Sequence, residues 1–403
     1  MPPETLPDGW TERRFDEMAK MVSERVDPAE TDLDVYVGLE HIEPETLRIK
    51  AHGVPSDVKG QKLRFRPGHV IFGKRRAYQR KLAVAEVDGI CSAHAMVLEA
   101  RPDVVHPDFL PFFMQSDLFM DRAVQISVGG LSPTINWKTL RKQTFALPPM
   151  DRQRELVEVF RGVEDVLTRQ DDALISAHHL YRALLTDLTS GDPESEDWSV
   201  KKLTEVTSYQ NGKAFPSKQY QDFGIRLLRP GNLSIHGYVK WNDDNTTHLP
   251  DSWADEAPSF LLEPGEIVMN LTAQSLDDEF LGRVCLVPEG PVSLLNQRIA
   301  RFTPIGIDSG LLFWALKSPY FRRQVDRVPT GTKVQHIYNS DLDSMDLLVP
   351  NSPEKQREIA STLFMAQREQ KTLRSHIGKA QKLKRSLLSD LLSPEAAVAE
   401  LEA

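Results

Sequence analysis

The same motifs occur twice in this chain, in the same order and about half a chain length apart, and this repeat constrains the fold more than any other feature. QREL at 153–156 returns as QREI at 356–359, a spacing of 203 residues. At that same spacing LYRALLTDLTS at 180–190 returns as LKRSLLSDLLS at 383–393. A repeat of this length predicts two copies of one structural module.

Further matches lie upstream of each QRE motif at a spacing of 202 residues. They pair Ser116 with Ser318, Phe119 with Phe321, Gly129 with Gly331, Ile135 with Ile337 and Pro148 with Pro350. The similarity extends from PGHVIF at 67–72 to PGEIVM at 264–269, and from Trp10 to Trp198. We therefore interpret the chain as two modules, about 10–190 and 198–393, joined by the Gly/Pro/acid linker GDPESED.

Each module is predicted to be a β-rich globular domain followed by a long helix. Short apolar runs bounded by Gly and Pro read as strands, and FALPP and LLVPN read as strands that stop at proline, with a helix beginning near Asp151 or Ser352. The predicted segments are 1–150 and 198–351 for the domains, 151–190 and 352–393 for the helices, 191–197 for the linker and 394–403 for a tail.

Apolar residues in both predicted helices follow an unbroken 4-3-4-3 spacing, which is the seam of a coiled coil. The first seam contains Leu156, Phe160, Val163, Leu167, Leu174, Ala177, Tyr181, Leu184 and Leu188, with Gln170 filling its one gap. The second contains Ile359, Leu363, Ala366, Gln370, Leu373, Ile377, Ala380, Lys384, Leu387 and Leu391. The alternative is that each helix packs only on its own domain. A sustained, narrow heptad stripe favours helix-on-helix packing, because it covers a partner helix better than a sheet.

Charge is distributed unevenly along the chain. With 49 Lys and Arg against 58 Asp and Glu the net charge is −9, so any DNA contact must come from a local patch. The stretch 48–81 holds eleven basic residues and one acid. Its candidate DNA contacts are Lys62, Arg64, Arg66, Lys74, Arg75, Arg76, Arg80 and Lys81. The alternative is a solvated basic face without a ligand.

The second module differs, because 242–280 holds ten acids and no Lys or Arg. Its DNA contacts are expected elsewhere, including the loop TGTKVQHI at 330–337. The candidates are Arg226, Arg229, Arg298, Lys333, Gln335 and His336. The first copy of that loop, SVGGLSPTINW, carries no charge.

Catalytic signatures are mostly missing. GHVIFGK at 68–74 nearly matches a phosphate-binding loop, but Arg75 stands where a Ser or Thr must hold Mg²⁺. LPPM at 147–150 lacks the polar and aromatic residues with which adenine methyltransferases hold a flipped base. Cys91 and Cys285 are the two cysteines, which is too few for a thiolate-rich metal site and typical of a reducing compartment. The longest apolar run, LLFWAL at 311–316, is too short to span a bilayer, so we expect a soluble cytoplasmic protein without membrane contact.

Taken together, these features resemble the specificity (S) subunit of Type I restriction-modification systems. The resemblance rests on the doubled domain-plus-helix order, on YVGLEHIEP at 36–44, DGICSAHAMVL at 88–98 and LLRPGN at 227–232, and on the two proline-then-QRE helix starts. It implies an α+β chain with two tandem target-recognition domains, whose two helices pair as an antiparallel coiled coil with pseudo-twofold symmetry. A rod of 38 residues, roughly 57 Å long, would then set the separation of the domains.

The resemblance also implies a division of labour. The S subunit catalyses nothing and binds no cofactor, reads an asymmetric bipartite site in double-stranded DNA, and recruits two DNA methyltransferase subunits together with restriction/translocase subunits. S-adenosylmethionine, ATP and Mg²⁺ are expected on those partners. One interpretation of the acidic stretch 242–280 is that it faces a methyltransferase subunit instead of DNA.

Two other functions stay open at this point. An S-like scaffold of another defence system would read no defined sequence, and sequence-specific binding in the presence of the methyltransferase distinguishes it. A lone DNA enzyme would show activity that depends on S-adenosylmethionine or a metal in the isolated chain.

Overall fold

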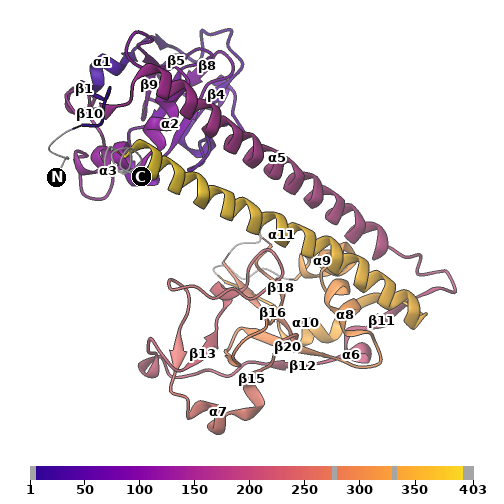
Figure 1. Ribbon diagram of the computed structural model, residues 1–403. Coiled ribbons are helices and arrows are strands. Elements are labelled where there is room, and N and C mark those ends of the chain that lie inside the picture. The colour runs from indigo at the N-terminus through magenta and orange to yellow at the C-terminus, as the bar shows by residue number, and fades with distance from the viewer. Residues whose placement is uncertain (1–5, 275–278, 329–333, 394–403) are drawn as a thin grey trace. The chain divides into compact units, whose positions relative to one another are not determined.

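The computed structural model describes residues 6–274, 279–328 and 334–393. Its contacts divide the chain into two compact units (Figure 1). Unit 1 combines Met1–Ala173 with Leu373–Ala403, and unit 2 is Leu174–Thr372. Both long helices, α5 (Met150–Leu188) and α11 (Pro353–Leu392), contribute one part to each unit.

Unit 1 contains two four-stranded sheets. In the first, which is antiparallel, the order is β2 (Ala19–Val22), β9 (Ala95–Ala100), β6 (Val70–Gly73) and β7 (Leu82–Val84). In the second the order is β3 (Arg25–Val26), β5 (Lys62–Phe65), β8 (Gly89–Cys91) and β4 (Tyr36–Val37), with β4 parallel to β8. The other elements are β1 (Thr11–Arg14), β10 (Thr144–Leu147), α1 (Phe15–Met18), α2 (Phe109–Gln115), α3 (Asp117–Gln125) and α4 (Trp137–Leu140).

Unit 2 repeats this arrangement with its own strands. The first sheet runs β12 (Thr207–Asn211), β20 (Ile299–Pro304), β16 (Ile267–Asn270) and β18 (Val284–Leu286). The second runs β14 (His248–Leu249), β13 (Ile225–Leu228), β19 (Ser293–Leu295) and β15 (Leu261–Leu262), with β13 parallel to β19. The rest are β11 (Trp198–Lys202), β17 (Thr272–Ala273), β21 (Gln335–His336), β22 (Asp346–Pro350), α6 (Leu203–Val206), α7 (Trp253–Glu256), α8 (Ser309–Ala315), α9 (Pro319–Val325) and α10 (Asn339–Ser344). The duplicated sequence therefore folds into a duplicated β-rich domain.

The repeated QRE motif has a structural cause at the start of each long helix. Gln153 is buried in α5, where its Nε2 donates to the Pro148 carbonyl at 2.9 Å and its Oε1 accepts from the His106 amide at 2.8 Å. Gln356 is buried in α11, where its Nε2 donates to the Pro350 carbonyl and its Oε1 accepts from the Asp308 amide. Each glutamine ties a helix start to the strand before it and to a loop of its own domain.

Replacing either glutamine by alanine is expected to lower the free energy of unfolding by about 1–3 kcal/mol, because a buried carbonyl and a partly buried amide both lose their partner. The two substitutions should cost similar amounts, since the hydrogen bonds are equivalent. Urea unfolding of Gln153→Ala and Gln356→Ala measures this, with exposed Arg357→Ala as the control. If either substitution lowered the free energy of unfolding by less than Arg357→Ala does, the hydrogen bonds of the glutamines would not stabilise the fold.

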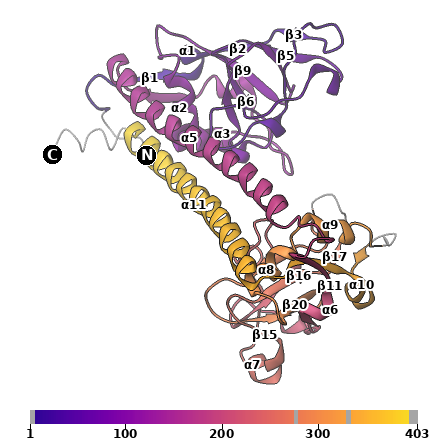
Figure 2. The ribbon, with the colours of Figure 1, turned by 90° about the vertical axis from the view of Figure 1, so that its right-hand side faces the viewer.

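The predicted heptad seam is confirmed. Every seam position in α5 and α11 is buried or half-buried. In unit 1 the start of α5, with Leu156 and Phe160, shares a core cluster with Leu388 and Leu392 at the end of α11. In unit 2 the end of α5, with Leu184, shares a cluster with Ile359 and Leu363 at the start of α11. The helices therefore run antiparallel, and within each unit both views show them side by side (Figures 1 and 2).

The idea that each helix packs only on its own domain is wrong, because each contacts the other helix and both domains. In unit 1 the Phe160 ring lies 5.2 Å from the ring of Phe112 in α2, and Leu388 of α11 belongs to the same cluster. In unit 2 Trp314 of α8 contacts Tyr181 of α5 at 5.8 Å between ring centroids and Phe364 of α11 at 5.1 Å. In each unit, the coiled-coil seam is therefore continuous with the hydrophobic core of the domain.

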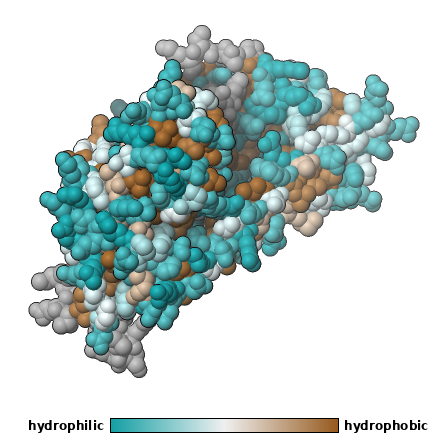
Figure 3. Space-filling view, turned by 90° about the horizontal axis from the view of Figure 1, so that it is seen from above, coloured by the Kyte–Doolittle hydropathy of each residue, from teal (hydrophilic) through white to brown (hydrophobic). Residues whose placement is uncertain are grey.

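The face drawn in Figure 3 is largely hydrophilic, with groups of apolar residues between hydrophilic ones. Among the helices that the structure describes, none combines the length and the apolar composition of a membrane span.

Candidate nucleic-acid interface

Five of the basic residues in 48–81 have carboxylate partners from elsewhere in unit 1. The ion pairs are Arg48–Asp172, Lys50–Glu43 and Lys50–Asp171, Arg64–Glu24 and Arg64–Asp88, Arg66–Glu24, and Arg80–Asp117. The hydrogen bond from Arg66 lowers the pKa of Glu24 below its usual value, so this carboxylate stays charged. The local charge is therefore smaller than the sequence segment alone indicates, although Arg64, Arg66 and Arg80 keep partly exposed guanidinium groups.

Two predicted lysines are bound to main-chain oxygens. The Nζ of Lys62 donates to the carbonyls of Lys59 and Gly60, and that of Lys81 donates to the carbonyl of Leu39. A carbonyl carries no formal charge, so these bonds hold the ammonium groups in place without neutralising them.

Lys74, Arg75 and Arg76 follow β6 directly, and both arginines are exposed. Arg75 Nε donates to Ser132 Oγ at 3.1 Å, and its Nη1 lies 3.3 Å from His94 Nε2. Arg76 adopts a left-handed backbone conformation, with φ 56°, and its amide donates to the Pro133 carbonyl at 2.7 Å. The loop around Ser132 thereby fixes the direction of the Arg75 guanidinium and the backbone of Arg76.

His94 lies among these cations. Burial lowers its pKa, and the charges of Arg75, Lys74 and Lys62 lower it further. His94 is therefore neutral at pH 7 and can both donate and accept a hydrogen bond. We call Lys62, Lys74, Arg75, Arg76 and His94 the basic cluster of unit 1. Such a cluster can contact phosphates through its cations and base edges through Arg75 and His94.

Main-chain hydrogen bonds identify the equivalent position in unit 2. The amide of Lys74 donates to the His94 carbonyl at 3.1 Å, and the amide of Ile135 donates to the Lys74 carbonyl at 2.8 Å. In unit 2 the amide of Leu271 donates to the Arg298 carbonyl at 2.8 Å, and that of Ile337 to the Leu271 carbonyl at 2.9 Å. His94 and Arg298 therefore occupy equivalent positions. Unit 2 has Leu271 where unit 1 has Lys74.

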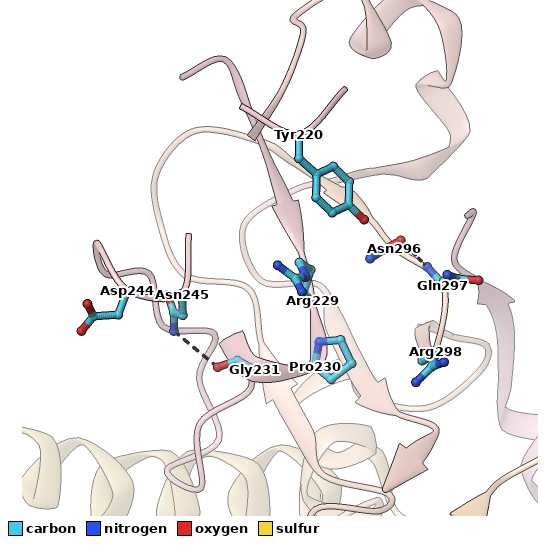
Figure 4. A pocket seen from close by; sticks show the side chains of 9 residues that line it. All are labelled: Tyr220, Arg229, Pro230, Gly231, Asp244, Asn245, Asn296, Gln297 and Arg298. Carbon is cyan, nitrogen blue, oxygen red and sulfur yellow. Dashed lines mark hydrogen bonds between the residues drawn. The ribbon is translucent and has the colours of Figure 1, made fainter. Parts of the chain in front are cut away.

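Arg298 and Arg229 line one open pocket of about 520 Å³ in unit 2 (Figure 4). The other lining residues are Tyr220, Pro230, Gly231, Asp244, Asn245, Asn296 and Gln297. The Arg229 guanidinium lies 5.7 Å from the Tyr220 ring centroid, and its Nη1 donates to Thr247 Oγ1 at 2.9 Å. Arg298 has a positive φ of 74°, which costs backbone energy in a non-glycine residue, and its side chain lines the pocket.

The other predicted contacts of unit 2 fall in three places. Gln335 and His336 form β21, which pairs with β17, and the charge of Arg298 adds to burial in lowering the pKa of His336. Arg226 does not line the pocket; its guanidinium lies 5.4 Å from the Trp241 ring centroid. Lys333 lies outside the described residues. The structure thus brings Arg229 and Arg298 together and places His336 within reach of the Arg298 charge.

The acidic stretch contributes to this pocket through Asp244. A pocket lined by a carboxylate and two arginines suits base edges, because cytosine N4 donates to Asp while guanine accepts from Arg. Asp277 and Asp278 lie outside the described residues. Charge counting along the sequence did not indicate that Asp244 and the arginines line one surface.

Several residues of the two sites were not identified from the sequence. Tyr220, Asn296 and Gln297 carry no charge and match no motif. His94 could have been found, because aligning CSAHAM at 91–96 with LNQRIA at 295–300 places it opposite Arg298.

The described residues contain no group of three or more His, Cys, Asp or Glu side chains placed to hold a metal ion. Burial raises the pKa of Cys91 and of Cys285 to about 12, so both are unreactive thiols at neutral pH. His178 lies on α5, where its Nδ1 is 3.4 Å from Gln370 Oε1 of α11.

A family model described as the Type I restriction modification DNA specificity domain matches residues 7–175. The Type I restriction enzyme MjaVIII specificity subunit of Methanocaldococcus jannaschii is 23% identical over 328 residues, which covers 78% of this chain and 76% of that protein. The EcoDI specificity subunit of Escherichia coli is 26% identical over 220 residues, covering 53% of this chain and 49% of that protein.

Two solved structures are similar to this fold. One, from work on complex assembly and conformational transition of the type I R-M system, has a TM-score of 0.56 at 19% identity and covers 97% of this chain and 99% of its own. The other, the Type I restriction-modification S subunit from M. genitalium, has a TM-score of 0.60 at 13% identity and covers 97% and 98%. At these identities the likeness concerns the fold.

Proposed function

This chain belongs to the family of Type I restriction-modification DNA specificity subunits, and we propose that its two domains each read one half of an asymmetric bipartite DNA site. The proposed division is 1–150 and 198–351 for the target-recognition domains, 151–190 and 352–393 for the spacer helices, and 191–197 for the linker. Members of the family are specificity subunits rather than the catalytic ones.

One observation carries the proposal. The same position of a duplicated fold holds a contact-forming polar group in both units, built around His94 in one and Arg298 in the other. The surroundings differ, because cations surround His94 whereas Asn296, Gln297 and Asp244 accompany Arg298. Equivalent positions with different hydrogen-bonding groups support two different half-sites.

The site residues take different roles in this proposal. Arg75, Arg229 and Arg298, with Gln335 and His336, contact base edges, for which guanidinium and amide groups have the right donors and acceptors. Lys62, Lys74, Arg76 and Lys81 contact phosphates. Arg64, Arg66, Arg80, Arg226 and Lys333 complete the proposed interface at its edges.

The two helices would act as the spacer. They contain 39 and 40 residues, which at about 1.5 Å per residue gives roughly 60 Å. Two readers on one face of B-DNA need centres about one helical turn, roughly 34 Å, apart. Helices of this length are long enough to span that separation.

We further propose that the chain recruits two DNA methyltransferase subunits and the restriction/translocase subunits, in the cytoplasm where the DNA lies. S-adenosylmethionine, ATP and Mg²⁺ would act on those partners, and this chain would contribute recognition and geometry. The solved structure that concerns complex assembly of the type I R-M system supports an assembled form.

A domain exchange tests this function. Replacing 1–150 by the matching domain of another specificity subunit, in the complex with its methyltransferase, should change one half of the methylated sequence and leave the other half and the spacer length unaltered. A change in both halves, or in neither, would contradict the assignment of one half-site to each domain. Methylation without any sequence preference would instead favour the scaffold alternative.

The basic cluster should determine part of the salt dependence. Replacing Lys74, Arg75 and Arg76 together by alanine should lower the slope of log affinity against log salt by about 0.9 for each phosphate that the protein no longer neutralises. If one of the arginines also reads guanine, the preference at one base position should relax by about 1–3 kcal/mol. Titrations of the assembled complex with specific DNA at several salt concentrations measure both effects.

A matched control removes three arginines that are paired with carboxylates: Arg14 with Asp16, Arg48 with Asp172 and Arg161 with Asp108. It changes the net charge equally and should leave the slope nearly unchanged. If the cluster variant and the control gave equal slopes, the cluster would be a solvated basic face that does not contact DNA.

A further inference from the structure

The loop that follows α3 in unit 1 has an unusual apolar tip. Val128 and Thr134 exchange both main-chain hydrogen bonds at 3.0 Å, which closes a tight hairpin. The tip includes Gly129, with φ 124°, and Leu131, whose side chain is 100% exposed. Val128 beside it is 78% exposed.

Burying the Leu131 side chain against a partner would contribute about 1.5–3 kcal/mol, because its apolar surface is still in contact with water. Leu131 is the most exposed large hydrophobic residue that the structure describes. The loop that carries it is nevertheless held firmly at its base by the paired Val128 and Thr134. Together with Val128, Leu131 places two exposed apolar side chains on a fixed support, which can bury surface against a partner at little further cost in conformational entropy.

The surroundings of the tip indicate which partner it meets. The Ser132 hydroxyl accepts a hydrogen bond from Arg75 Nε, and the Pro133 carbonyl accepts one from the Arg76 amide. The backbones of Thr134 and Arg75 form an isolated antiparallel β-bridge. The apolar tip therefore projects beside the basic cluster of unit 1. A cationic border around one apolar side chain is complementary to DNA, in which phosphates flank stacked bases.

We propose that Leu131 is an apolar wedge that inserts against a base step of the first half-site when the domain binds DNA. The inference rests on the proposed function and adds a specificity residue to it. Leucine and other apolar side chains of DNA-binding proteins partly unstack base steps, and flexible pyrimidine–purine steps yield most easily. Arg75 and Arg76 hold the loop, Arg76 contacts a phosphate and Arg75 a base edge beside the wedge, so the wedge enters at a fixed register.

The test compares Leu131→Ser with Leu131→Met in the full chain assembled with its methyltransferase partner. Ile305→Ser is the matched control, because Ile305 is 49% exposed and follows β20, at the end of that strand away from Arg298. The readouts are affinity for specific and for random duplex, the salt slope, and the fluorescence of 2-aminopurine placed at successive steps of the first half-site, away from the methylated adenine.

Leu131→Ser should lower affinity for the specific duplex about tenfold or more, with little change for random duplex or in the salt slope. The rise in 2-aminopurine fluorescence on binding should disappear. Leu131→Met should keep most of the specific affinity and of the fluorescence rise, and Ile305→Ser should leave both unchanged.

Three outcomes would overturn the wedge: unchanged specific affinity of Leu131→Ser, reduced affinity with the fluorescence rise intact, and failure of Leu131→Ser to assemble with its partner. The last would assign the tip to a protein interface. Failure of the proposed function looks different, since the unsubstituted complex itself would then prefer no DNA sequence.

Discussion

Replacing Glu164 by leucine is expected to lower the free energy of unfolding by about 3–5 kcal/mol, because it leaves a buried ammonium group without its counter-charge. Glu164 of α5 forms an ion pair with Lys384 of α11, whose side chain is only 2% exposed. Lys384 also donates to the Glu45 carbonyl at 3.2 Å and lies 5.8 Å from the Phe112 ring centroid. The Glu45 carboxylate forms its own ion pair with Arg385, at 2.7 Å, and so does not replace Glu164.

The two single substitutions should lower the free energy of unfolding by different amounts. Lys384→Leu should cost less than Glu164→Leu, since the Glu164 side chain is 16% exposed and can still reach water. The double substitution to leucine should come close to the unsubstituted stability or exceed it, because an apolar pair in the seam avoids desolvating two charges. Urea unfolding of the three variants completes the cycle. Removing the exposed pair Asp151–Arg154 is the control and should cost no more than about 1 kcal/mol. Additive costs in the cycle would mean that the two side chains do not interact.

The second large effect is expected where the seam and the core of unit 2 coincide. Leu363 is 0% exposed and shares a cluster with Leu184 and with residues of α8. Aspartate at both positions places two like charges in an apolar interface, at a cost of several kcal/mol each, beyond the stability of most domains. Unit 2 should unfold and partner assembly should be abolished.

Limited proteolysis and gel filtration with the partner subunits measure this effect. Met365→Asp serves as the control, since Met365 lies two residues further along α11 and is 64% exposed. It should leave both protease resistance and assembly intact. Normal assembly of the Leu184→Asp, Leu363→Asp variant would contradict the antiparallel packing.

The helix seam could be predicted because its heptad period lies within one continuous segment of the sequence. Seam positions such as Leu156 and Leu363 are buried as the heptad indicates. The polar seam positions Gln370 and Lys384 could be recognised as interruptions, but their partners, His178 and Glu164, depend on a register between segments about 200 residues apart.

The residues that we propose to face DNA could only partly be placed from the sequence, because charge density along a chain does not reveal what folds against it. Arg64 and Arg66 belong to a basic segment, yet Glu24 comes from a strand connection about 40 residues earlier. The pocket around Arg229 is assembled from three segments that begin near Tyr220, Asp244 and Asn296. No single stretch of sequence holds enough of it to be recognised.

We propose that the two domains of one chain read two half-sites at a distance fixed by the helices. Mapping of N6-methyladenine across the genome of cells that carry this chain with its partner subunits should then show one asymmetric motif of two specified blocks, separated by a fixed number of unspecified bases. A single contiguous motif, a spacer of variable length, or methylation without a motif would contradict it.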